Sequence, residues 1–174
     1  MRHLMVDIET LDTRHTAVVL SVGYCLFTRD HVEEPKQFLC ELTPQMQEGR
    51  TVSADTIRWW MGQSDEARMS VFDPDLPRIS RADLIGRLRL LTGNSEIASI
   101  WAHGATFDLP ILSSYLGVDL FNFRTIRDTR TLAMLAPKVE RDAPTIKHHA
   151  GYDAEAQAKW VLNMLRHLGM ENAL

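Results

Sequence analysis

Two carboxylates at the end of an apolar run are the feature that most constrains how this chain can fold. Residues 5–10 read MVDIET, in which Asp7 and Glu9 follow hydrophobic residues typical of a buried strand. Side chains two residues apart on a strand point to the same face, about 7 Å apart along the chain. Burying two ionised carboxylates costs free energy, because each loses water and each repels the other. The fold therefore has to bring positive charge to them, and two carboxylates on one face can share a divalent cation.

The apolar pattern predicts three strands in series, followed by a mixture of helices and strands. The expected strands cover residues 3–10, 16–27, 36–43, 99–104 and 123–128. The expected helices cover residues 54–62, 84–91, 107–117, 129–136 and 152–168, and a further short helix is expected to begin after Ser64. We therefore expect one α/β domain over residues 1–174, with a mixed five-stranded sheet whose first three strands are antiparallel and helices on both faces.

Several polar residues stand where helices are expected to begin or end. A side-chain oxygen at the N-cap accepts a hydrogen bond from a free backbone N–H of the first turn. The expected N-caps are Ser53, Ser64, Ser80 and Thr106. Gly93 and Asn94 are expected to end the helix that follows Ser80.

Composition limits the class of protein. No apolar stretch reaches the length of a membrane span, and the N-terminus lacks the apolar core of a signal peptide, so we expect a cytoplasmic protein with no membrane partner. Cys25 and Cys40 lie in strand-like runs and are expected to be reduced core residues rather than a disulfide or zinc ligands. The formal net charge of −4 argues against coating nucleic acid by bulk charge, but allows an enzyme that grips a few nucleotides.

Two further motifs carry acids near expected helix starts. Asp108 lies in WAHGATFD (101–108), after an expected strand, and His148 and Asp153 lie in HHAGYDAEAQA (148–158). Each motif alone has an ordinary structural explanation, since acids are favoured in the first turn of a helix and about one Asp-x-Glu triplet is expected by chance in this chain. Their order along the chain is what favours a shared site.

Taken together, MVDIET, HGATFD and HHAGYDA resemble the DEDDh group of 3′-to-5′ exonucleases, which includes RNase T, oligoribonuclease and the proofreading subunit of bacterial DNA polymerase. The resemblance runs from residue 5 to about residue 158. TIRWWMGQSDEAR (56–68), WAHGATFDLPIL (101–112) and RDTRTL (127–132) are similar to the short RNase AS-like exoribonucleases and related phage exonucleases. The chain departs from the usual pattern at Leu11 and at His103, and both positions bear on how the terminal nucleotide is held.

The resemblance implies an RNase H-like fold and a site with two magnesium ions, for which manganese can substitute. In that group Asp7 would bridge both ions, Glu9 and Asp153 would ligate the more tightly bound one, and Asp108 would act partly through water. His148 would be the general base, because the pKa of histidine lies near neutral pH. His149 does not have the spacing of the motif. The product would be a nucleoside 5′-monophosphate released from a 3′ end.

The substrate implied is single-stranded nucleic acid, with RNA favoured. The residues expected to hold the terminal nucleotide are Thr10, Leu11, Trp60, His103 and Phe107. Because Trp59 and Trp60 point about 100° apart on a helix, only one of the pair is expected to face the cleft. The alternatives are an exodeoxyribonuclease, a non-catalytic nucleic-acid-binding module, and a structural protein whose acids are surface residues. The resemblance also implies that two copies of the chain can associate as a homodimer.

Overall fold

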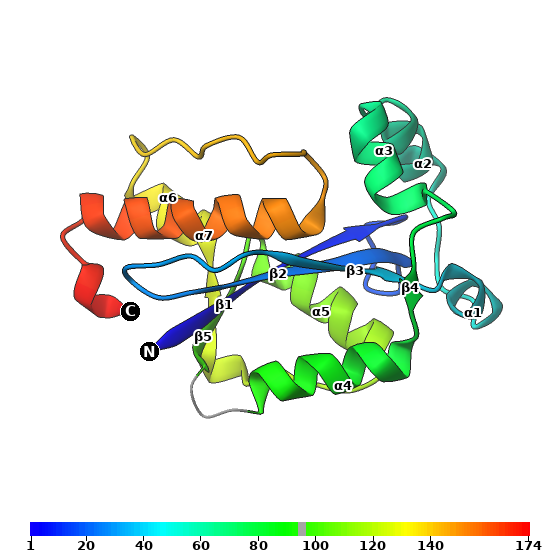
Figure 1. Ribbon diagram of the computed structural model, residues 1–174, viewed down its shortest axis with the longest axis horizontal. Helices are drawn as coiled ribbons and strands as arrows, with labels where there is room; N and C mark the ends of the chain where they lie inside the picture. Colours follow the sequence, from blue (N-terminus) through cyan, green and yellow to red (C-terminus); the bar gives the residue numbers. More distant parts are fainter. Residues whose placement is uncertain (94–96) are drawn as a thin grey trace.

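A six-stranded mixed sheet forms the middle layer of the protein. The computed structural model describes residues 1–93 and 97–174 (Figure 1). Strands follow the order β4-β3-β2-β1-β5-β6 across the sheet. As predicted, the first three strands pair antiparallel, whereas β1 with β5, β5 with β6, and β3 with β4 pair in parallel. The strands are β1 (Arg2–Thr10), β2 (Val19–Phe27), β3 (Lys36–Cys40), β4 (Arg78–Ile79), β5 (Ile97–Ala102) and β6 (Ile126–Asp128).

The expected count of five strands is wrong, because β4 adds a sixth. This strand has only two residues and pairs with Leu39 and Cys40. It follows a proline-containing loop, and two residues are too few to show a strand period in the sequence. The end of the strand expected over 36–43 is instead helical. There the side-chain amide of Gln45 bonds the backbone of Val19 in both directions, at 2.8 and 2.9 Å.

Helices cover both faces of the sheet, as predicted. Leu4, Val6 and Ile8 of β1 pack in the cluster that includes residues of α4 and α5. Met5, on the opposite face, packs with residues of α6 and α7, and Figure 1 shows α7 above the sheet with α4 and α5 below it. The helices are α1 (Leu42–Gln47), α2 (Ala54–Met61), α3 (Asp65–Phe72), α4 (Arg81–Thr92), α5 (Ala105–Leu116), α6 (Thr129–Leu135) and α7 (Ala150–His167), with short 3₁₀ turns at Phe123–Thr125 and Glu171–Ala173.

Three of the four expected helix caps are correct. The side chains of Ser53, Ser64 and Ser80 accept first-turn N–H bonds at the starts of α2, α3 and α4. Thr106 is not the cap of α5, because that helix begins two residues earlier, after Gly104 in a left-handed conformation. Gly93 is the C-cap of α4, and Asn94 lies outside the described residues. Among the described helices, none combines the length and apolar character needed to cross a membrane.

The start of α7 rests directly on the sheet at Gly23. A Cβ atom at this position would lie 2.0 Å from the backbone carbon of Ala150 and 2.3 Å from the nitrogen of Gly151, so no larger residue fits. Gly23 is the β2 partner of Asp7 in the sheet register. The close approach therefore sets the first turn of α7 beside the acidic end of β1.

Candidate active site

The four acids named by the sequence motifs come from three elements and converge at one end of β1. Asp7 and Glu9 lie on β1, Asp108 lies in the first turn of α5, and Asp153 lies in the first turn of α7. Glu9, Asp153 and His148 each offer one possible ligand atom, and these three atoms lie within 4.8 Å of one another. Residues 144 positions apart in the chain thus share one small volume, which is the arrangement that the motifs predict.

Hydrogen bonds tie Asp7, Asp108 and Asp153 to the backbone or to a neighbouring side chain. The carboxylate of Asp108 accepts a bond from the backbone N–H of Ile8, which lies between the two acids of β1. Gln157 Nε2 donates to Asp7 Oδ1 over 2.8 Å. Gln157 lies one helical turn after Asp153 and so faces the same side of α7. Because Gln157 follows Asp153 by four residues, its place on the same face of the helix could have been predicted from the sequence.

The acids repel one another, and burial strengthens the effect. Burial raises the pKa of all four carboxyl groups, and the charge of a neighbouring acid raises three of them further. The pKa of Asp7 rises to about 7, first through burial and then through the charge of Asp153. Arg141 opposes this rise at Asp7 and Asp153, but does not remove it. A cluster of oxygen donors with this excess of negative charge fits divalent cations, which bind such ligands.

His148 stands at the edge of the acid cluster in an uncommon backbone conformation. Its φ of 62° lies in the left-handed region, which histidine enters more readily than most residues. Its N–H donates to Asp153 Oδ2 over 2.8 Å, and its Nδ1 lies 3.8 Å from Glu9 Oε1. Burial lowers the pKa of its ring below the usual 6.5, so the imidazole is neutral at physiological pH and can accept a proton.

His149 has a structural role instead. Its Nδ1 accepts the backbone N–H of Tyr152 over 3.2 Å, which makes it the N-cap of α7, and its ring packs on that of Tyr152 with centroids 4.3 Å apart. The spacing of His149 excludes it from the motif, as expected, whereas its role as a cap was not predicted from the sequence.

The structure separates the two adjacent tryptophans. Trp60 is 2% exposed, packs with Leu20 and Leu39, and donates its indole N–H to the carbonyl of Thr10 over 3.0 Å. Trp59 is 45% exposed, and its ring centroid lies 4.7 Å from that of His148. Trp60, which was expected to bind substrate, is thus a buried core residue, and the exposed Trp59 is the better candidate for stacking on a base. Contact of either ring with a nucleotide stays a prediction.

The other expected substrate-binding residues are partly or wholly buried around the site. Thr10 is buried and its hydroxyl donates to the carbonyl of Asp12, and Leu11 packs against the cluster that holds Trp60. His103 shares a hydrogen bond of 2.7 Å with Thr129, and Phe107 packs on the core below the sheet. Their contact with a nucleotide remains a prediction.

The RDTRTL segment ties the strand-to-helix turns after β5 and β6 together, which the sequence did not reveal. Asp128 Oδ2 accepts the N–H of Ala105 at the start of α5 over 2.6 Å, while its Oδ1 accepts the N–H of Arg130 over 2.7 Å. The turn that carries Asp108 toward the other acids is thus held by the start of α6.

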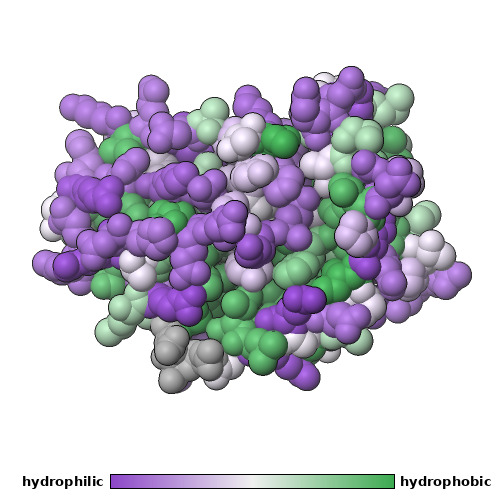
Figure 2. All heavy atoms as spheres, viewed as in Figure 1, coloured by the Kyte–Doolittle hydropathy of each residue, from purple (hydrophilic) through white to green (hydrophobic). Residues whose placement is uncertain are grey.

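A groove of about 1510 Å³ lies elsewhere, on the face shown in Figure 2, where apolar side chains gather between hydrophilic ones. It is lined by parts of β3, α3, α4 and the start of α7, including Phe38, Leu76 and Leu90. Neither His148 nor any of the four clustered acids lines it.

Known proteins match this chain in family and in fold. The model of the 3′-5′ exoribonuclease Rv2179c-like domain matches residues 2–165. No curated protein matches the sequence. Exonuclease X in complex with 5′ overhanging duplex DNA superposes with a TM-score of 0.61 at 18% identity, covering 95% of this chain and 92% of that one. The nuclease domain of 3′hExo, a DEDDh family member, bound to rAMP, gives 0.60 at 14% identity, covering 98% and 94%. Cell-death related nuclease 4 gives 0.57 at 12% identity, covering 95% and 64%.

Proposed function

The chain belongs to the Rv2179c-like 3′-5′ exoribonuclease domain family and is a 3′-5′ exonuclease of the DEDDh type, and from this premise we propose that it shortens single-stranded RNA one nucleotide at a time. The observation that carries the proposal is the convergence of Glu9, His148 and Asp153 within 4.8 Å, beside Asp7 and Asp108. Each turnover releases a nucleoside 5′-monophosphate and leaves a strand with a new 3′-hydroxyl.

Asp7, Glu9, Asp108 and Asp153 are the residues that would hold the divalent ions. Their shared burial and mutual repulsion fit a cation better than an empty pocket, and DEDDh exonucleases use divalent metals. We propose magnesium, with manganese as a substitute. Ions held by these residues would lower the pKa of the attacking water and stabilise the departing 3′-oxygen.

His148 is the proposed general base. Its neutral ring lies at the mouth of the acid cluster with about a third of its side chain exposed, where it can take the proton of the attacking water. The bond to Asp153 Oδ2 from its backbone holds the residue in place. The edge of the Trp59 ring packs against the imidazole and limits its movement.

Trp59 is also the proposed stacking surface for a base of the strand. Stacking of a base on an aromatic side chain is worth about 1–3 kcal/mol and does not depend on sequence. The exposed indole lies next to His148, so a base resting on it would belong to a nucleotide near the cleaved bond.

RNA is favoured over DNA because the matching family model is described as an exoribonuclease. Single-stranded DNA is the second candidate, since Exonuclease X, which shares the fold, is described in complex with DNA. Digestion of matched 5′-labelled RNA and DNA strands with magnesium distinguishes the two. Ladders that shorten from the 3′ end, with nucleoside 5′-monophosphates as product, are the expected result for RNA. No shortening of either strand with magnesium or manganese would contradict the proposal.

Whether the protein forms a homodimer is a separate question, which sedimentation of the purified protein tests.

A further inference from the structure

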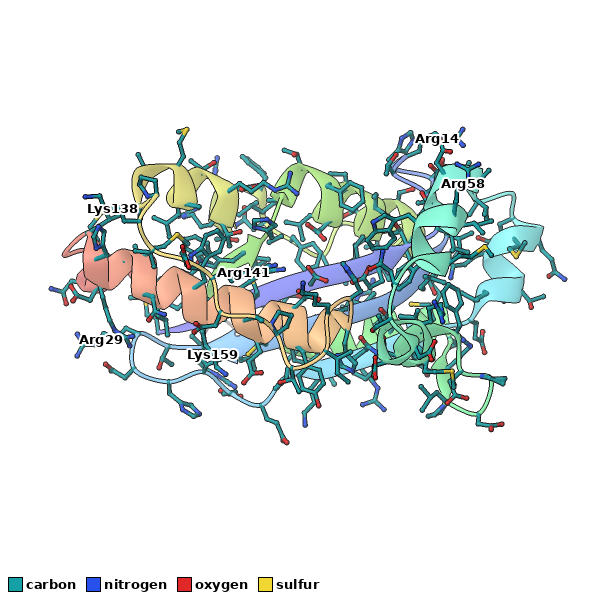
Figure 3. All side chains as sticks on the ribbon, turned by 90° about the horizontal axis from the view of Figure 1, so that it is seen from above. Arg14, Arg29, Arg58, Lys138, Arg141 and Lys159 are labelled. Atoms are coloured by element: carbon teal, nitrogen blue, oxygen red, sulfur yellow. The ribbon has the colours of Figure 1, made fainter. Side chains whose placement is uncertain are left out.

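Two arginines frame the acid cluster without pairing with any acid. Arg130 is the second residue of α6, and Arg141 lies on the segment between α6 and α7, which Figure 3 shows passing beside α7 with Arg141 labelled near its middle. Both residues are exposed. Across the part of the chain that the structure describes, neither guanidinium has a hydrogen-bond or ion-pair partner. By contrast, Arg14 and Arg58 are each bonded to a carboxylate at 2.7 Å.

Arg130 lies against the turn that starts α5. Its guanidinium carbon is 3.2 Å from the position where a Cβ of Gly104 would lie, so a side chain at this position would crowd the guanidinium. Asp128 fixes the backbone of this residue by accepting its N–H. The guanidinium is therefore held one turn before Asp108, and its charge opposes the rise that burial causes in the pKa of Asp108.

Arg141 approaches the cluster from another element. Its charge acts on Asp7, on Asp153 and on the ring of His148. Both arginines act on His103, which lies at the end of β5. The charges of both arginines, one on α6 and one on the segment that follows it, thus act on the same region around His103.

The charge balance of the site indicates what these two arginines bind. Four carboxylates and two divalent ions cancel, so the negative charge of a nucleic-acid phosphate is not offset by that set. Arginine presents a planar fork of N–H donors that matches two phosphate oxygens, and neither fork is occupied by the protein. We propose that Arg130 and Arg141 form an arginine clamp that binds a backbone phosphate of the strand beside the acid cluster. This inference rests on the proposed nuclease function.

Binding under varied salt tests the clamp separately from cleavage. A fluorescent single-stranded RNA is titrated by anisotropy, with magnesium present, into protein carrying His148→Ala, which keeps all four acids. In this background Arg130→Gln and Arg141→Gln should each weaken binding about tenfold, as expected for loss of a charged hydrogen bond. Replacing both arginines should reduce the slope of log Kd against log salt by about 0.7, the value for one phosphate contact on a single strand, and each single variant should reduce it by part of that amount.

Conservative and distant variants complete the design. Arg130→Lys and Arg141→Lys keep the positive charge, so they should restore the salt slope that the glutamine variants lose. They should recover affinity only in part, because lysine lacks the forked N–H donors of a guanidinium. Arg29→Gln is the matched control, since Arg29 lies at the other end of α7 and bonds Asp30 and Asn172 (Figure 3). It should change neither affinity nor slope.

The outcomes separate the clamp from the function on which it rests. Unchanged affinity and slope in both glutamine variants overturn the clamp, even if the protein with native His148 digests RNA. A change in only one variant overturns the pair and confines the contact to that arginine. Arg141→Gln alters an exposed position away from helix ends, so it decides the matter if Arg130→Gln does not fold. If the native protein neither binds nor shortens any strand, the proposed function itself is wrong.

Discussion

Replacing Asp7 by asparagine should stabilise the metal-free protein while abolishing its activity. The pKa of Asp7 rises to about 7, mainly through burial and then through the charge of Asp153. The folded protein therefore resists ionisation of this carboxyl, whereas the unfolded chain does not. Asparagine removes the charge and keeps an Oδ1 that can accept the bond from Gln157.

The size of the effect follows from the ionisation of Asp7. A rise in pKa from 3.8 to about 7 corresponds to at most about 4 kcal/mol, since each pH unit is worth about 1.4 kcal/mol. Asp7 is partly exposed and ionises together with the other acids, so we expect about 1–2 kcal/mol of the free energy of unfolding. For a chain of 174 residues this corresponds to an increase in Tm of about 2–8 °C.

Thermal unfolding in EDTA at several pH values measures this effect. Because the folded pKa is raised, the wild type loses stability as pH rises from the unfolded value of 3.8 to about 7. The advantage of Asp7→Asn should be largest near pH 8 and shrink toward about pH 4, where Asp7 is protonated in both states. With manganese at a hundred times Kd, the wild type should gain about 2.7 kcal/mol and the variant much less. A variant that is no more stable than wild type in EDTA near pH 8 would refute the reasoning.

Four further changes test the residues around the acids. His148→Ala should lower kcat about 10²–10⁴-fold, as expected for loss of a general base, in a single-turnover assay with RNA. Trp59→Ala should raise KM for RNA by about tenfold with little change in Tm, because its stacking surface is exposed, as steady-state digestion will show. Trp60→Ala should instead lower the free energy of unfolding in urea by about 3–5 kcal/mol, because the buried indole leaves a cavity. His149→Ala should cost about 1 kcal/mol in urea through loss of the α7 cap and leave the base in place.

Each of these expectations has an outcome that contradicts it. Near-normal kcat in His148→Ala would remove this residue from proton transfer. A large loss of stability in Trp59→Ala, or wild-type stability in Trp60→Ala, would contradict the roles that burial assigns to the two tryptophans. If His149→Ala lost kcat as His148→Ala does, the distinction between cap and base would not hold.

Local sequence was enough for most of the elements and for singling out the acids. The caps at Ser53, Ser64 and Ser80 and the apolar period of β1 depend on residues a few positions apart, so a short window contains the information. The order of the three acidic motifs likewise identified the family to which the chain belongs.

Packing between distant segments decided the rest. The acids of β1 meet Asp153 because Gly23 lets the start of α7 rest on the sheet, a contact between residues far apart in the chain. Burial likewise chose Trp59 over Trp60 as the exposed ring, although the two are neighbours in sequence. The placement of Arg130 over Gly104 and the two-residue strand β4 also depend on tertiary neighbours. A linear pattern fixes which residues share a helix face or a strand face, but the distance between two faces is set only when the whole core packs.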